Sequence, residues 1–162
     1  MTRAKGPSYV VYYRRRREGK TDYKKRLALV KSGKTRMVIR RSNKALVIQF
    51  VDFYPEGDKT LLTMSSNQLS KDYKWPAKRN IWTGYLAGLM AGKLAQKKGV
   101  KEFVLDVGMY GSSKGSVIYA ALQGATDSGL KSNFDSKMIP DFSTVPDKYK
   151  KAFEEVKSKL NG

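Results

Sequence analysis

Residues 80–107 read NIWTGYLAGLMAGKLAQKKGVKEFVLDV, and this stretch decides the fold. Its first part places large apolar side chains in two neighbouring rows with a spacing of four residues: Ile81, Tyr85 and Leu89 in one, and Trp82, Leu86, Met90 and Leu94 in the other. So wide an apolar stripe is typical of a helix that is buried against a sheet. Asn80 is a favourable N-cap, and Lys97 and Lys98 suit the negative end of the helix dipole. The sequence therefore predicts a long buried helix from residue 81 to about residue 98.

A third row of this helix has no side chains, because it consists of Gly84, Gly88 and Gly92. Glycine inside a helix costs about 1 kcal/mol relative to alanine, so three of them in one row need a physical reason. We expect another backbone to approach the helix closely along this row. The partner could be a strand, a second helix or RNA.

The apolar run Phe103-Val-Leu105 follows the long helix and is bounded by charged residues and Gly108. After a long helix, such a run is typical of a buried parallel strand reached by a right-handed crossover. Three earlier runs, separated by short polar turns, predict consecutive antiparallel hairpins: 35–40, 45–53 and 59–65. The sequence thus predicts an α/β fold with a mixed sheet of three antiparallel strands plus one parallel strand, packed with helices. This order is shared with ribonuclease-H-like folds.

Other helices are expected on both sides of this unit. Thr21 or Asp22 can cap a helix over about residues 23–30, which Gly33 ends, and another is expected over residues 116–128. The tail should end in a short helix with an apolar stripe, and two of its residues have the spacing of a capping box, Thr144 and Asp147. We therefore divide the chain into a basic extended arm (1–20), an α/β domain (21–130) and a C-terminal linker and helix (131–162).

Positive charge is concentrated at the N-terminal end of the chain. The 162 residues include 33 Lys+Arg and 14 Asp+Glu, which gives a net charge of +19. Residues 1–44 hold 16 of the basic residues and only two acids, Glu18 and Asp22, so this part alone carries +14. The asymmetry predicts a surface that faces a polyanion.

The composition excludes several classes of chemistry. The chain contains no cysteine and no histidine, which excludes disulfides, Cys/His zinc sites and histidine acid–base catalysis. It lacks an N-terminal apolar segment and an apolar run long enough to span a bilayer. We expect an intracellular protein with no membrane, cofactor or small-molecule partner.

Four consecutive arginines, Arg14 to Arg17, follow three tyrosines, Tyr9, Tyr12 and Tyr13. The arginine fork matches phosphate geometry, and a tyrosine ring can support an unstacked base. Together with Lys20, these residues are candidates for an RNA-binding arm. Taken alone, such a charge run is equally typical of a solvated tail.

Two turns add further candidates. The first hairpin turn places Arg40, Arg41 and Lys44 around Ser42-Asn43, which suits either RNA contact or an ordinary exposed turn. The glycine-rich segment 108–115 follows a strand and opens a helix, where outward N–H groups favour an anion. It could contact an RNA phosphate or form a structural turn, and its polar candidates are Ser112, Ser113 and Lys114.

An enzyme would have to rely on carboxylates and lysines. Ribonuclease-H-like nucleases place several acids on central strands to bind two metal ions. Here the first strand has no acid, Asp52 lies near the end of the second, and Asp106 ends the parallel strand. An exposed or capping role for Asp106 is the simpler interpretation. A metal-dependent nuclease remains the alternative, and we predict no enzyme activity and no metal site.

Several motifs, in order and with suitable spacing, resemble one family: the large-subunit ribosomal protein of the L-eighteen/L-five-e kind in its archaeal form. The resemblance covers about residues 8–130 and rests on seven segments: Tyr12–Glu18, Thr21–Leu27, Lys31–Lys34, Arg40–Lys44, Gly84–Lys93, Val104–Gly108 and Gly115–Gly129.

The resemblance implies a fold of the translational-machinery type and a place in the cytoplasmic ribosome. It implies binding to 5S rRNA, contact with large-subunit rRNA in the central protuberance, and a neighbouring protein of the L-five family. The positions that match the family's RNA contacts are Arg14 to Arg17, Lys24, Lys25, Arg26, Lys34, Arg40, Arg41, Ser42, Asn43 and Lys44. The tyrosines are added from their chemistry alone.

Overall fold

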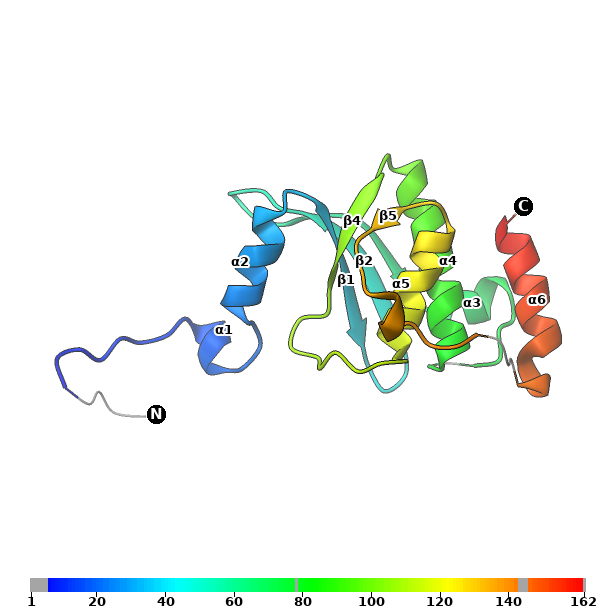
Figure 1. Ribbon diagram of the computed structural model, residues 1–162, viewed down its shortest axis with the longest axis horizontal. Helices are drawn as coiled ribbons and strands as arrows, with labels where there is room; N and C mark the ends of the chain where they lie inside the picture. Colours follow the sequence, from blue (N-terminus) through cyan, green and yellow to red (C-terminus); the bar gives the residue numbers. More distant parts are fainter. Residues whose placement is uncertain (1–5, 78, 143–145, 162) are drawn as a thin grey trace.

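A five-stranded sheet stands between two groups of helices in the computed structural model, which describes residues 6–77, 79–142 and 146–161 (Figure 1). The strand order is β3-β2-β1-β4-β5. The strands are β1 (Thr35–Arg41), β2 (Leu46–Asp52), β3 (Lys59–Ser65), β4 (Glu102–Asp106) and β5 (Lys131–Ser132). The first three pair antiparallel, and β4 pairs parallel with β1 and with β5. The predicted mixed sheet is confirmed, and β5, which is too short to form a pattern, was missed.

The core lies between one face of the sheet and two helices, α4 (Ile81–Lys97) and α5 (Val117–Asp127). Met37 and Ile39 of β1 and Ile48 and Phe50 of β2 are completely buried in this core. Asn80 caps α4 by accepting a hydrogen bond from the Thr83 amide, with an oxygen–nitrogen distance of 2.7 Å. The apolar stripe thus marked both the long helix and the face that it buries.

The glycine row of α4 lies against α5, so the partner is a second helix. A Cβ atom added at Gly88 would lie 2.0 Å from the Ala121 carbonyl oxygen. The contact is reciprocal, because a Cβ atom at Gly124 of α5 would lie 2.1 Å from the Tyr85 carbonyl oxygen. Backbone therefore packs directly on backbone, which fixes the spacing of the helices on the sheet.

The N-terminal helices α1 (Arg14–Arg17) and α2 (Tyr23–Lys31) lie on the other side of the sheet from α4 and α5 (Figure 1). Asp22 caps α2 by accepting from the Lys24 and Lys25 amides, and Gly33 after the helix has a φ of +65°. The prediction of an extended arm was wrong for Arg14–Arg17, which form one helical turn. Arginine is a good helix former, and Glu18, four residues after Arg14, partly offsets the repulsion.

The C-terminal part ends in a helix, α6 (Asp147–Asn161), that packs on the outer side of α4 (Figure 1). It also includes η1 (Ser136–Met138), while α3 (Asn67–Asp72) precedes α4. The predicted stripe of α6 is buried at Phe153, Val156 and Leu160, and the Phe153 ring lies 5.8 Å from that of Trp82. At 15 residues, α6 is longer than the short helix expected. The capping box falls outside the described residues, since Thr144 is among those not described.

Among the helices of the described ranges, none has the length and apolar character needed to cross a membrane.

Replacing Gly88 with alanine should destabilise the protein. The gain in helix propensity is about 1 kcal/mol, but the new methyl group collides with a backbone oxygen that cannot move alone. We expect a net loss of about 2 kcal/mol, seen as a fall in Tm of about 4–8 °C by circular dichroism. Gly111→Ala is the control, because nothing lies within 4 Å of that position. Equal Tm values for the two variants would contradict the close helix contact.

Candidate nucleic-acid interface

The predicted RNA-binding residues occupy three connected regions. The basic segment (residues 9–34) includes α1 and α2, the hairpin tip (residues 40–44) joins β1 to β2, and the glycine loop (residues 107–116) joins β4 to α5. The basic segment lies on the side of the sheet away from α4, whereas the hairpin tip lies at one end of the sheet, where Arg79, just before α4, contacts it (Figure 1). The three regions come from distant parts of the sequence and meet at β1 and β4.

The arm places its aromatic rings beside its own cations. The Arg16 guanidinium lies over the Tyr12 ring, 4.1 Å from its centroid, and the Tyr13 ring lies 5.5 Å from that of Tyr23. Tyr13 nevertheless remains 75% exposed, so its contact with α2 leaves most of the ring accessible. Tyr9 is also exposed. The tyrosines therefore brace the arm and still present surface to a ligand.

Glu18 is the acid that partly neutralises the arginine run. Its carboxylate lies 2.8 Å from the Lys20 ammonium and 3.8 Å from Arg14. The hydrogen bond from Lys20, with the charges of nearby arginines, holds the pKa of Glu18 below its usual value. Arg15 instead donates to the Thr21 hydroxyl at 2.8 Å.

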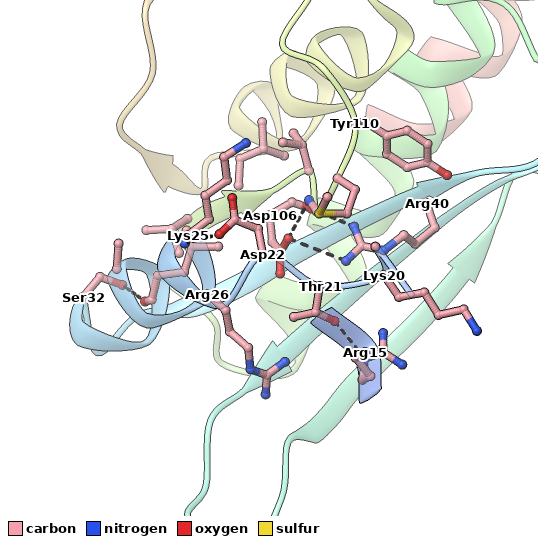
Figure 2. A pocket seen from close by; sticks show the side chains of 18 residues that line it. Arg15, Lys20, Thr21, Asp22, Lys25, Arg26, Ser32, Arg40, Asp106 and Tyr110 are labelled. Atoms are coloured by element: carbon pink, nitrogen blue, oxygen red, sulfur yellow. Dashed lines mark hydrogen bonds and ion pairs between the residues drawn. The ribbon is translucent and has the colours of Figure 1, made fainter. Parts of the chain in front are cut away.

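A cavity of about 680 Å³ separates the basic segment from β4 and the glycine loop (Figure 2). Its wall carries two acids, Asp22 and Asp106, and five cations: Arg15, Lys20, Lys25, Arg26 and Arg40. All nine residues of α2 remain half-buried or exposed. The segment thus spans a positively charged hollow instead of packing tightly on the sheet.

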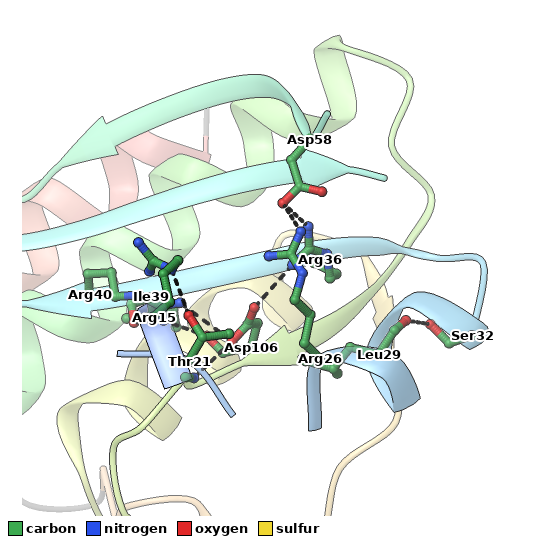
Figure 3. Close-up of polar contacts among 11 residues, drawn as sticks. Arg15, Thr21, Arg26, Leu29, Ser32, Arg36, Ile39, Arg40, Asp58 and Asp106 are labelled. Atoms are coloured by element: carbon green, nitrogen blue, oxygen red, sulfur yellow. Dashed lines mark hydrogen bonds and ion pairs between the residues drawn. The ribbon is translucent and has the colours of Figure 1, made fainter. Parts of the chain in front are cut away.

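A chain of ion pairs runs across the sheet beneath this cavity (Figure 3). Its centre is Arg36, which is only 2% exposed. Its guanidinium lies 2.7 Å from the Asp58 carboxylate and 3.3 Å from the Asp106 carboxylate. Asp58 also pairs with Arg26 of α2 at 2.8 Å. The chain therefore connects α2, the β2–β3 turn, β1 and the end of β4.

Asp106 is buried, so the prediction of an exposed acid was wrong. Pairing of β4 beside β1 brings Arg36 to it, and Arg40 lies 3.6 Å from the same carboxylate. The Gly108 amide donates to Asp106 at 2.8 Å, so the capping role is present. A buried carboxylate of this kind is stabilised by its paired guanidinium groups.

The ion pairs divide the predicted RNA-binding cations into a paired and an unpaired group, and Arg14 and Lys20 belong to the paired group through Glu18. Arg26 and Arg40 are paired within the network, and Lys34 lies 2.7 Å from Glu102, whose pKa it lowers. Within the described ranges, other cations of the set have no carboxylate within ion-pair distance: Arg15, Arg16, Arg17, Lys24, Lys25, Arg41, Lys44 and Lys114. This second group remains available to a polyanion.

The hairpin tip is held in one conformation by side chains. The Ser42 hydroxyl accepts from the Ala45 amide at 2.9 Å, so Ser42 shapes the turn. Arg79 donates to the Ser42 carbonyl at 2.9 Å, and the Tyr110 hydroxyl donates to the Arg41 carbonyl at 2.9 Å. Sequence reasoning missed both Arg79 and Tyr110, because neither lies near the hairpin in the chain.

Three amides of the glycine loop are used within the fold. The amides of Gly108, Tyr110 and Gly115 donate to Asp106, Val107 and Met138, respectively. The loop also presents exposed polar residues at its surface: Ser112, Ser113 and Lys114. Asn43 and Lys44 are likewise exposed at the hairpin tip.

The acids considered for a nuclease are engaged elsewhere. Arg36 and Arg40 surround Asp106, and Asp52 accepts a hydrogen bond from the Thr35 hydroxyl at 2.7 Å. In the described ranges, no three His, Cys, Asp or Glu residues are grouped so that they could hold a metal ion. The geometry at these strand ends is that of a structural ion-pair network.

Comparisons with known proteins give one consistent result. A family model described as "Ribosomal large subunit proteins 60S L5, and 50S L18" matches residues 7–104. The chain is 43% identical over 153 residues to the large ribosomal subunit protein uL18 of Korarchaeum cryptofilum, covering 94% of this chain and 78% of that protein.

Two further archaeal proteins with the same description are similar. The one from Aeropyrum pernix is 45% identical over 137 residues, which cover 84% of this chain and 64% of that protein. The one from Methanothermobacter thermautotrophicus is 40% identical over 142 residues, covering 88% and 74%.

Asp58 should make the stability of the folded protein depend on pH in the acid range. Partial burial opposes its ionisation, but hydrogen bonds from Arg36 and Arg26 outweigh burial and hold its pKa below the usual 3.8. The stabilisation is therefore complete above about pH 3.8 and is lost as pH falls through the lower folded-state pKa. We expect Asp58→Asn to cost about 2 kcal/mol at neutral pH, and the difference from the wild type should shrink in acid.

Urea unfolding across a pH series measures this effect. Glu56→Gln is the matched control, because it removes an exposed acid from the same turn and should change stability by less than about 0.5 kcal/mol. A cost for Asp58→Asn that stays constant through the acid range would contradict the network.

Proposed function

The chain belongs to the L5e/uL18 family of large-subunit ribosomal proteins, and from this premise we propose that it binds 5S rRNA in the central protuberance. Membership makes it a structural constituent of the large ribosomal subunit, with rRNA and ribosomal proteins as partners. The family is not enzymatic, so the nuclease alternative is wrong. The finer proposal includes contact with the large-subunit rRNA and a neighbouring protein of the L-five family.

The observation that carries the proposal is the charge of +14 on residues 1–44, beside a globular part that is nearly balanced. Of these, residues 9–44 form the basic segment, β1 and the hairpin tip. A polyanion that binds this side relieves the repulsion among these cations and releases its own counterions. The family motifs in the same segments support 5S rRNA as that polyanion.

The arm and the hairpin tip have different roles in this proposal. Arg14 to Arg17 lie on one exposed helical turn, so their side chains point in several directions and can reach phosphates on more than one strand. The hairpin tip is fixed by Arg79 and Tyr110 and offers a rigid contact. Lys24, Lys25 and Lys44 add exposed charge to these surfaces.

Removing residues 1–20, or replacing Arg14 to Arg17 with alanine, should weaken binding to 5S rRNA and flatten its dependence on salt. Each lost phosphate contact lowers the slope of log K against log salt by about 0.7–0.9. Four lost contacts would therefore lower the slope by about 3, as measured by filter binding between 50 and 300 mM salt.

The matched control removes the same charge from another exposed surface. Lys148, Lys150, Lys151 and Lys159 lie exposed on α6, on the far side of the sheet from the basic segment (Figure 1). Their joint replacement with alanine should leave the slope nearly unchanged. An equal change in slope for the two quadruple variants would show that net charge matters and the arm does not.

A further inference from the structure

We propose that Arg41 and Tyr110 form a stacking platform for an unpaired nucleobase of the bound RNA. The inference rests on the proposed function for the identity of that RNA. It goes beyond charge attraction, because it assigns the planar guanidinium of Arg41 a stacking contact with a base. It also brings into the interface a residue from the glycine loop, Tyr110, that no family motif indicated.

The two side chains already form a layered unit. The Arg41 guanidinium lies over the Tyr110 ring, 4.9 Å from its centroid. The Tyr110 hydroxyl reaches past it and donates to the Arg41 carbonyl at 2.9 Å. Tyr110 therefore contacts both the backbone and the side chain of one residue. Arg41 is itself exposed, so its guanidinium remains accessible on the side away from the ring.

The platform is anchored before any ligand arrives. Arg79 holds the tip through the Ser42 carbonyl, and Ser42 closes the turn onto Ala45. The glycine loop is fixed at its start, where the Gly108 amide donates to Asp106. Gly108 has a φ of +61°, a conformation that favours glycine, and a Cβ atom there would lie 3.0 Å from the Arg40 guanidinium, which would have to shift. A platform fixed in advance loses little entropy on binding.

The chemistry of this unit favours a base over a phosphate alone. Sequence-specific proteins hold splayed RNA bases on aromatic rings and on arginine planes. Among the described residues, Arg41 has no carboxylate at ion-pair distance, so its charge is not neutralised, and Tyr110 occupies only one side of its guanidinium. Asn43 and Lys44 lie exposed beside it, where an amide can meet a base edge and an ammonium a phosphate.

The test replaces the planar guanidinium of Arg41 with the ammonium group of lysine, which keeps the positive charge. Arg41→Lys should weaken binding to 5S rRNA about tenfold with the salt slope unchanged, because lysine keeps the charge and loses the planar group on which a base stacks. Lys150→Arg, the reverse exchange on the exposed surface of α6 outside the proposed interface, is the control and should leave the affinity within about twofold of the wild type. Equal affinities of the Arg41→Lys variant and the wild type would overturn the platform.

Two substitutions of Tyr110 separate stacking from bracing. Tyr110→Phe keeps the ring and loses the hydroxyl bond to Arg41, so affinity should stay within about threefold. Tyr110→Leu removes the ring and should weaken binding about tenfold, with Tm measured beside it to confirm folding. A Tyr110→Phe variant that binds as weakly as Tyr110→Leu would make Tyr110 a structural brace and reject the inference.

The same variants are compared on 5S rRNA and on the large-subunit rRNA. Binding of the wild type to the large rRNA alone would overturn the 5S assignment. The affinity of the Arg41→Lys variant relative to the wild type on the large rRNA would then test the stacking platform. Binding to 5S rRNA with no effect of Arg41→Lys would reject the platform alone. Binding to neither RNA would overturn both.

Discussion

The guanidinium of Arg36, buried between two carboxylates, is the interaction on which the basic surface depends. Moving an arginine out of water is costly, and the cost is offset only when paired acids meet its donors. Asp106 accepts a hydrogen bond from Nη1 of Arg36, and Asp58 lies at ion-pair distance from Nη2. Asp58 extends the pairing to Arg26 of α2. The network therefore joins elements that hydrophobic packing does not join, because α2 contributes no buried residue to the core.

The network also explains how a strongly basic chain tolerates its own charge. Some cations are paired with acids of the protein, where they connect its helices, strands and loops, and others have no acid partner and are exposed on the surface. Arg26 and Arg40 illustrate the first kind, whereas Arg17 and Lys44 illustrate the second. A count of basic residues cannot separate the two kinds. The distinction matters for function, since only the second kind gains fully from contact with phosphates.

Local patterns predicted much of the fold because they depend on neighbours along the chain. The apolar stripe of α4, its glycine row and the run Phe103–Leu105 each carry their own signal, and all three were confirmed. The burial of Asp106 could not be predicted, because its partner Arg36 lies 70 residues away and meets it only when β4 pairs with β1. Tyr110 was missed for the same reason, since it reaches the hairpin tip across 69 residues.

The two ends of the basic surface differ in stiffness, and this difference suits two kinds of recognition. The basic segment spans a hollow of about 680 Å³ and is held to the sheet through few polar contacts, so it can adjust to the path of an RNA backbone. Phosphate contacts of this kind bring affinity without information about sequence. The hairpin tip is anchored by Arg79, Ser42 and Tyr110, so its groups stand at fixed positions. Discrimination between RNAs requires such fixed geometry, and it should therefore reside at the tip and not in the arm.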